Sequence, residues 1–257
     1  MMRYILSVLI GLILGSFANV CILRLPEDQS LAFPRSHCPC CHQALKVFHN
    51  IPIVSYLVLR GRCAYCGVSI SLQYPLIEAL MAALFIFHAW FFTEPLRIVL
   101  ADVLGFYLIC ISIIDYRHRI IPDELSLSLA IFGFLFSMVN PYLDGPPWMK
   151  LLVSVASGLS GGILMYLLAF AGEKAFKKEA LGGGDIKLIA ASGAVLGWLG
   201  IVGPLMLGSL AGGVAALVLL IGKKKRFGET LPFGPFLSLG IYITCLFPNW
   251  WTSLVSP

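Results

Sequence analysis

The chain is 257 residues long, and 59% of these residues are hydrophobic whereas only 12% are charged. With a mean hydropathy of +0.90 it carries more apolar surface than a soluble domain of this length buries, which excludes an ordinary water-soluble fold. The net charge of +5 does not indicate nucleic-acid binding, because the basic residues are spread over loops between apolar segments. The composition therefore predicts a protein that crosses a lipid bilayer several times.

About eight apolar stretches are predicted to be transmembrane helices. Each is nearly free of charge, and a helix of about 18 residues rising about 1.5 Å per residue crosses a ~30 Å hydrocarbon core. In chain order the stretches are Tyr4 to Val20, Pro75 to Phe92, Ile98 to Ile114, Leu125 to Val139, Leu151 to Ala171, Ile186 to Leu199, Ile201 to Ile221 and Phe233 to Phe247. The expected fold class is an all-α polytopic membrane protein.

The distribution of lysine and arginine predicts the orientation, because short loops rich in these residues stay in the cytoplasm. Alternate loops contain Arg24, Arg35, Lys46, Arg60, Arg62, Arg117, Arg119, Lys174, Lys177, Lys178, Lys223, Lys224, Lys225 and Arg226, whereas the opposite side has Arg3, Arg97 and Lys150. The pattern predicts that both termini lie outside and that the basic loops lie in the cytoplasm.

The only long polar segment, residues 25–74, lies between the first two spans and carries two C-x-x-C pairs. The pairs are Cys38 with Cys41 and Cys63 with Cys66. This spacing is typical of a zinc ribbon or knuckle, in which each pair supplies two thiolates to a tetrahedral ion. We expect the zinc site to be structural, because four thiolates leave no open position for water. A segment this small also has too little core to stay folded without a cross-link such as a bound metal.

Two other interpretations of the cysteines remain at this point. They could be reduced thiols without a metal, or they could have a redox role; disulfides are disfavoured because a cytoplasmic loop is kept reducing. The ligand set is also open, because Cys40 lies inside the first pair and His37 and His42 flank it.

Two aspartates at the ends of predicted spans are the main candidates for chemistry. Asp115 closes the third span and Asp185 opens the sixth, and both are expected at the cytoplasmic membrane boundary. Acidic residues at such positions are costly to desolvate and are functional candidates by default. Two carboxylates brought together share a proton, and such a pair can polarise a peptide carbonyl while activating a water. The pattern favours an aspartic protease.

Three glycines, Gly182, Gly183 and Gly184, precede Asp185. Without side chains they are expected to let an extended substrate approach and to permit positive φ angles. The alternative is a plain helix start, with Asp185 stabilised by the helix dipole. Four other acidic residues near the boundary offer different pairings: Asp123, Glu124, Glu179 and Glu78. Asp123 follows Pro122 and is interpreted first as a helix cap.

Several segments in order resemble the type IV prepilin peptidase family, also called leader peptidase and N-methyltransferase, whose members are GxGD aspartyl proteases. The segments are Gly15-Ser16-Phe17 with Asn19 and Arg24-Leu25-Pro26, then Asn50-Ile51-Pro52 with Gly61-Arg62-Cys63, Tyr74-Pro75 and Glu78, then Asp115, the Gly182–Asp185 loop and Leu231-Pro232-Phe233-Gly234-Pro235. Three positions depart from the family pattern: Gln73 stands where arginine is usual, His42 follows Cys41, and Ala180 stands where glycine is common.

The resemblance implies an activity, cofactors and partners. It implies that Asp115 and Asp185 are catalytic, that the substrates are prepilins or pseudopilins of a type IV pilus or type II secretion system, and that the new N-terminus is methylated from S-adenosylmethionine. It also implies a multi-pass protein of the bacterial inner membrane. The chain is accordingly divided into a first helix (1–24), a tetracysteine loop (25–74) and a peptidase domain (75–257).

Three other interpretations compete with this one. A GxGD peptidase without methyltransferase activity would share the pair of catalytic aspartates, Asp115 and Asp185, which we call the dyad. A presenilin-type protease should carry Tyr-Asp and Pro-Ala-Leu motifs, and neither occurs. A metal or solute transporter would place acidic and thiol groups near the bilayer midplane, whereas here they gather toward one face. The sequence does not indicate an oligomeric state.

Overall fold

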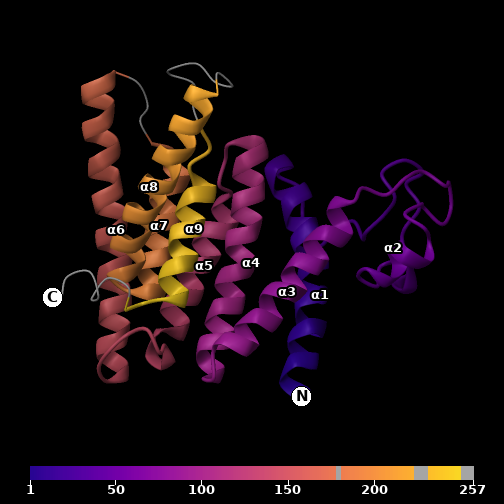
Figure 1. Cartoon of the computed structure of the whole chain (residues 1–257), viewed down its shortest axis with the longest axis horizontal. Coiled ribbons are helices and arrows are strands. Elements are labelled where there is room, and N and C mark those ends of the chain that lie inside the picture. Colours follow the sequence, from indigo (N-terminus) through magenta and orange to yellow (C-terminus); the bar gives the residue numbers. More distant parts are fainter. Residues whose placement is uncertain (178–180, 223–230, 250–257) are drawn as a thin grey trace. The chain divides into compact units, whose positions relative to one another are not determined.

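The computed structural model describes residues 1–177, 181–222 and 231–249, and the described residues are helical apart from loops and two isolated bridges (Figure 1). The α-helices are α1 (Met2–Arg24), α2 (Val54–Val58), α3 (Gln73–Phe91), α4 (Pro95–His118), α5 (Asp123–Phe136), α6 (Pro147–Phe176), α7 (Gly183–Leu196), α8 (Leu199–Ile221) and α9 (Gly234–Leu246). Three short 3-10 helices, η1 (Leu25–Glu27), η2 (Val47–His49) and η3 (Ser137–Val139), complete the set. The all-α prediction is confirmed.

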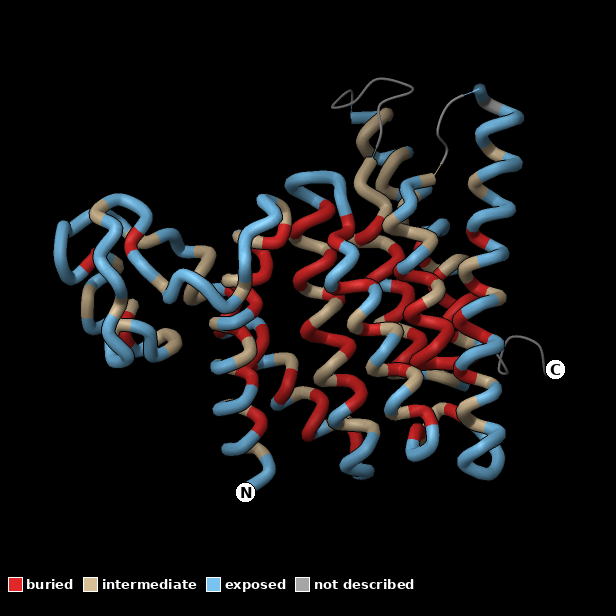
Figure 2. Tube along the Cα trace, turned by 180° about the vertical axis from the view of Figure 1, so that it is seen from behind, coloured by how far each residue is buried: buried red, intermediate tan, exposed pale blue. Residues whose placement is uncertain are grey.

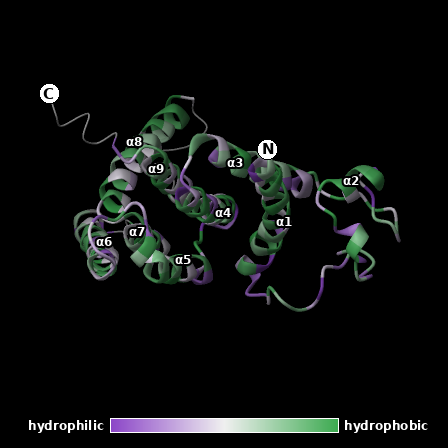
Figure 3. Ribbon diagram, turned by 90° about the horizontal axis from the view of Figure 1, so that it is seen from below, coloured by the Kyte–Doolittle hydropathy of each residue, from purple (hydrophilic) through white to green (hydrophobic). Residues whose placement is uncertain are grey.

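Within the described part of the chain, five helices are long and apolar enough to cross a membrane, which makes this a multi-pass membrane protein. They are α1 continued by η1, α3, α4, α6 and α8. Each predicted span falls on a helix, but α5, α7 and α9 have only 14, 14 and 13 residues. In the end-on view of Figure 3, the helices are coloured mainly as hydrophobic and the hydrophilic residues gather in connecting segments.

The chain forms two compact units, residues 1–106 and 107–257, and the first is built on the pairing of α1 with α3. Gly11 and Gly15 lie on one face of α1, four residues apart. A Cβ added at Gly11 would lie 2.7 Å from the Ala82 Cα, and one added at Gly15 would lie 2.7 Å from the Glu78 Cα. Such distances exclude any side chain, so this is the small-residue packing common between membrane helices.

A buried polar cluster fastens the cysteine loop to this helix pair. The Asn19 side-chain amide donates to the Tyr74 carbonyl at 3.2 Å, and the Glu78 carboxylate accepts the Ile53 N–H at 2.7 Å. Ile53 has a φ of 61°, which is rare for a β-branched residue, and this hydrogen bond holds it there. Gln73, despite departing from the family pattern, donates to the Asn19 Oδ1 at 3.4 Å.

The second unit is built around α7. Its residues Leu188, Ile189 and Ala191–Leu196 are buried, and α5, α6, α8 and α9 all contact it. Figure 1 labels α7 between α6 and α9, and Figure 2 shows buried residues as red runs along the helices. A Cβ at Gly193 would lie 2.7 Å from the Ser157 carbonyl oxygen of α6. Helix α7 is thus apolar all round because other helices enclose it.

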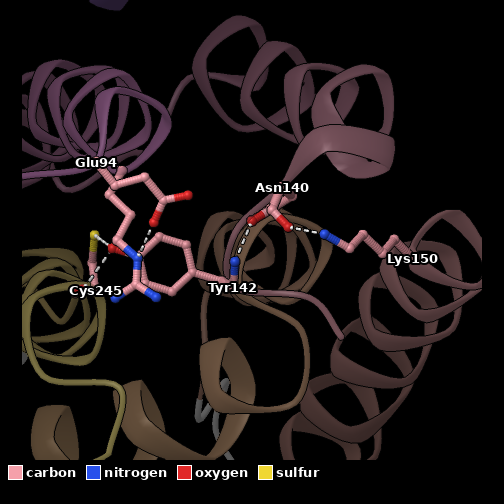
Figure 4. A network of polar contacts seen from close by, with 6 residues as sticks. Glu94, Asn140, Tyr142, Lys150 and Cys245 are labelled. Atoms are coloured by element: carbon pink, nitrogen blue, oxygen red, sulfur yellow. Dashed lines mark hydrogen bonds and ion pairs between the residues drawn. The ribbon is translucent and has the colours of Figure 1, made fainter. Parts of the chain in front are cut away.

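The loop between α5 and α6 is held by a polar network at the C-terminal end of α7 (Figure 4). The Asn140 amide donates to the Val195 carbonyl at 2.7 Å, and its Oδ1 accepts the Tyr142 N–H at 2.8 Å. The Tyr142 hydroxyl donates to the Cys245 carbonyl at 2.9 Å, and Lys150 donates to the Asn140 carbonyl at 2.8 Å. These bonds tie the loop that follows η3 to α6, α7 and α9, at the end of α7 opposite Asp185.

Candidate functional site

The second unit brings the two predicted aspartates together. Asp115 lies in the last turn of α4, and Asp185 lies in the first turn of α7, 70 positions later in the printed sequence. Burial, and after it the negative charge of Asp115, raise the pKa of Asp185 to about 6, so the two carboxylates interact electrostatically. Asp115 is only 6% exposed, whereas Asp185 is partly exposed. A buried and a partly exposed carboxylate whose charges interact in this way can titrate as a coupled pair.

Asp115 is held by the start of α9. The Gly234 N–H donates to the Asp115 Oδ2 at 2.8 Å, and both residues are buried. In the sequence, Leu231–Pro235 stands out only through the family resemblance, which predicts no contact for it. The available signal was a proline-flanked glycine opening an apolar helix, which is a common helix start and therefore weak.

The three glycines before Asp185 open α7, with Gly182 as the N-cap. Gly182 has a φ of −73°, and neither Gly183 nor Gly184 has a positive φ, so the expectation of left-handed backbone here was wrong. Steric room is the relevant property instead. A Cβ at Gly184 would lie 2.7 Å from the Ile121 Cβ, whereas one at Gly183 would meet nothing within 4 Å. Gly183 therefore leaves the backbone beside Asp185 open.

Asp123 does not cap α5, contrary to the sequence interpretation. Pro122 takes the N-cap position, Asp123 is the first helical residue, and no side chain caps the helix. The Asp123 Oδ1 instead accepts a charged hydrogen bond from the Lys187 ammonium at 2.6 Å. Both side chains are about half exposed, at 56% and 43%. The pair joins the start of α5 to the start of α7, two residues after Asp185.

The other acidic candidates that the structure describes have different surroundings. Glu78 belongs to the first unit, where it binds the Ile53 N–H, and Glu124 is exposed. Glu179 lies outside the described residues. Sequence reasoning overlooked Asp102, which lies inside α4 and pairs with the buried His88 of α3 at 2.7 Å. That partner offsets the cost of a carboxylate within an apolar helix, so Asp102 has a structural explanation.

The two C-x-x-C pairs form matching turns. The Cys38 N–H donates to the Gln43 carbonyl and the His42 N–H to the Cys38 carbonyl; the Cys63 N–H donates to Val68 and the Gly67 N–H to Cys63 in the same way. An isolated bridge flanks each turn, between His37 and Ala44 and between Arg62 and Ser69. The two turns are therefore one structural unit repeated 25 positions apart.

The four thiols converge as a tetrahedral metal site requires. The Sγ atoms of Cys38, Cys41, Cys63 and Cys66 all lie within 4.8 Å of one another, and the Cys38 and Cys66 sulfurs are 3.8 Å apart. Four thiolates at about 2.3 Å from zinc lie about 3.8 Å from one another. Hydrogen bonds from the backbone of Cys41 and Cys40 lower the pKa of the Cys38 thiol to about 6. Against a backbone hydrogen bond from Val68, which acts to lower it, burial and the neighbouring thiols raise the pKa of Cys66 to about 12.

The alternative ligands lie outside this cluster. Cys40 is exposed, and the rings of His37 and His42 lie near each other, with centroids 6.2 Å apart. His42 has a φ of 56° and occupies the position that Gly67, with a φ of 72°, occupies in the second turn. His42 is thus explained by the turn, because histidine is among the side chains that tolerate this conformation.

Two family models match the chain. Residues 9–92 match the Bacterial Peptidase A24 N-terminal domain, and residues 102–217 match the Type IV leader peptidase family. The first match contains the four clustered cysteines, and the second contains Asp115 and Asp185. No solved structure matches the chain.

Curated relatives align with nearly the whole chain. A prepilin leader peptidase/N-methyltransferase of Pectobacterium carotovorum subsp. carotovorum is 35% identical over 252 residues, covering 90% of this chain and 88% of the relative. One of Myxococcus xanthus (strain DK1622) is 38% identical over 222 residues, covering 86% and 64%. A type 4 prepilin-like proteins leader peptide-processing enzyme of Escherichia coli O78:H11 is 35% identical over 265 residues, covering 95% of each.

Proposed function

Because this chain belongs to the type IV leader peptidase family, we propose that Asp115 and Asp185 are the carboxylates with which it cleaves prepilin leaders. The family's two activities, prepilin cleavage and N-methylation, are those of this chain. The meeting of Asp115 and Asp185 from two helices within one compact unit is the observation that supports the assignment.

The dyad suits hydrolysis through one shared proton. One carboxylate takes a proton from the attacking water while the other gives its proton to the carbonyl oxygen of the scissile peptide. The resulting tetrahedral intermediate then collapses: the amine leaves with the proton taken from water, and a hydroxyl proton returns to the carboxylate that gave one. Both carboxylates regain their starting state, and no covalent bond to the enzyme forms.

The glycines of residues 182–184 form the approach to this site. A client's backbone must come within hydrogen-bonding distance of Asp185, and a side chain on the neighbouring loop would hold it away. The open space at Gly183 meets that need. The clients are prepilins or pseudopilins, cut on the cytoplasmic side of their apolar helix.

The tetracysteine site suits a structural zinc ion. Four thiolates would complete its tetrahedral coordination, and the ion would join the two repeated turns of a loop that has a small core. Backbone N–H groups of the loop orient the thiolates, and hydrogen bonds of Glu78 and Asn19 anchor the loop to α1 and α3.

His42→Gly should leave metal content unchanged. Glycine adopts the same positive φ at a similar conformational cost, so we expect the free energy of unfolding to change by about 1 kcal/mol or less. Elemental analysis of purified protein should find about one zinc per chain in both the variant and the wild type. Loss of zinc in His42→Gly, comparable to the loss in Cys41→Ser, would make His42 a ligand and refute the four-thiolate site.

We place the methyl donor, S-adenosylmethionine, on the same loop, where it would supply the methyl group. Phe48, His49 and Tyr65 form an aromatic cluster there, with ring centroids 4.4 Å and 5.4 Å from that of His49. The His49 Nδ1 is buried, with no hydrogen-bond partner among the described residues. Aromatic faces stack with an adenine ring and attract a sulfonium cation, so this cluster fits the donor's chemistry. In this proposal the chain has three functional parts, a first helix (1–24), a loop that binds the methyl donor (25–74) and a peptidase domain (75–257).

The loop and the dyad are assigned to the cytoplasmic side of the bacterial inner membrane. The bias of lysine and arginine supports this orientation. The decisive assay for the whole proposal incubates detergent-purified protein with a prepilin and S-adenosylmethionine. Mass spectrometry of the client should find a shortened chain with a methylated N-terminus. An unchanged client under these conditions, with a known prepilin peptidase active in parallel, would refute the proposed function.

A further inference from the structure

Helix α9 begins directly against Asp115, and this contact has no assigned role in the reaction. The donor to Asp115, the N–H of Gly234, comes from 119 residues further along the chain. Helix α9 is itself packed tightly on α8, since a Cβ at Gly240 would lie 2.8 Å from the Pro204 Cα. The N–H that meets the carboxylate is therefore carried by a rigid element rather than by a loop.

The contact leaves no room for a side chain at residue 234. A Cβ there would lie 2.8 Å from the Oδ2, 3.0 Å from the Cγ and 3.1 Å from the Cβ of Asp115. All three atoms belong to Asp115, so a larger residue would have to push that carboxylate aside. Gly234 has no positive φ, which means that close approach, and not backbone conformation, requires glycine.

The two carboxylates are held from different parts of the unit. Asp185 lies beside Gly182, the N-cap residue of its own helix α7, whereas Asp115 accepts a hydrogen bond from the first residue of α9. A hydrogen bond from a backbone N–H both orients a carboxylate and favours its charged form. The relative orientation of the dyad consequently depends on where α9 begins.

We propose that Gly234 is a positioning residue of the peptidase: its N–H orients Asp115 against Asp185, and its lack of a side chain permits this. The inference rests on the proposed roles of Asp115 and Asp185. Acid–base chemistry is sensitive to such positioning, because a displacement of about 1 Å can cost about 100-fold in rate.

Gly234→Ala should lower kcat for prepilin cleavage by about 10- to 100-fold while KM stays within about twofold. Gly234→Pro, which also removes the N–H, should lower kcat further. The matched control is Gly213→Ala on α8, where a Cβ meets nothing within 4 Å and kcat should not change. Methylation of a pre-cleaved client should be unchanged in all three variants, because the methyl donor is placed on the loop of the first unit. Circular dichroism of each variant should match that of the wild type, which checks that the helices of the second unit are folded.

A double-mutant cycle separates positioning from general damage. If the added methyl collides with Asp115, Gly234→Ala should lower Tm less in an Asp115→Ala background than in the wild type. Should Gly234→Ala fail to accumulate, Asp115→Ala is expected to restore its accumulation. Wild-type kcat in Gly234→Ala, a rise in KM alone, or an equal loss of stability in both backgrounds would overturn the inference. Full cleavage by Asp115→Asn and Asp185→Asn would instead refute the dyad itself.

Discussion

Asp115→Asn and Asp185→Asn are each expected to reduce prepilin cleavage by at least about 10²- to 10⁴-fold, the usual contribution of a general acid or base. An amide keeps the shape of the carboxyl group but cannot exchange its proton. In Asp115→Asn the amide oxygen can still accept the Gly234 N–H, so the helices around it should remain assembled. The measurement is the initial rate of leader release, followed by mass spectrometry of the client.

Asp123→Asn is the matched control for these variants. It changes an acidic residue near the same helix junction, but one that is half exposed and paired with Lys187. Loss of an exposed ion pair costs about 1 kcal/mol or less, so cleavage should stay close to the wild-type rate. Equal losses in Asp123→Asn and Asp115→Asn would show that general disturbance of the junction, and not the dyad, controls activity.

Replacing Cys63 and Cys66 together by serine should abolish methylation while cleavage falls less. The change removes half of the metal ligands from a loop whose small core depends on the metal for folding free energy. The dyad lies in the other compact unit and should remain assembled. The readout is the mass of the client after reaction with S-adenosylmethionine, and we expect a cleaved, unmethylated product.

Cys40→Ser provides the control for the cysteine variant, because Cys40 is an exposed thiol in the first turn that lies outside the cluster. It should retain both zinc and methylation. Asp115→Asn, in contrast, should still methylate a pre-cleaved client. Proportional loss of both activities in the aspartate and cysteine variants, with both proteins folded, would mean that the two reactions share one site.

The features predicted well from sequence depend on residues that are near one another in the chain. Each apolar stretch determines its own helix, because backbone hydrogen bonds within a bilayer must be made locally. The cysteine cluster could be predicted equally well, since the C-x-x-C spacing encodes the turn that brings two sulfurs together. The approach of Asp115 to Asp185 was predicted from their shared membrane boundary, and their catalytic role stays a prediction.

The features missed depend on contacts between distant segments. Nothing near Gly234 in the sequence indicates that its N–H meets Asp115. Asp102 lies inside the predicted span Ile98 to Ile114, and its partner His88 lies on a different helix, so the sequence alone does not show how its charge is offset. Asp123 was misread for the same reason: a local capping rule could not anticipate that Lys187 would offer a charged partner.

Helix α7, which carries Asp185, is packed against four other helices. Hydrophobic mismatch acts on helices that face the acyl chains, and α6 and α8, with 28% and 11% of their apolar windows buried inside the protein, turn most of those windows outward. Helix α7, surrounded by α5, α6, α8 and α9, is not required to match the bilayer's thickness, which explains how 14 residues suffice. A thicker or thinner bilayer would therefore tilt the outer helices first. The position of Asp185 would change less than that of the outer helices when the lipid composition changes.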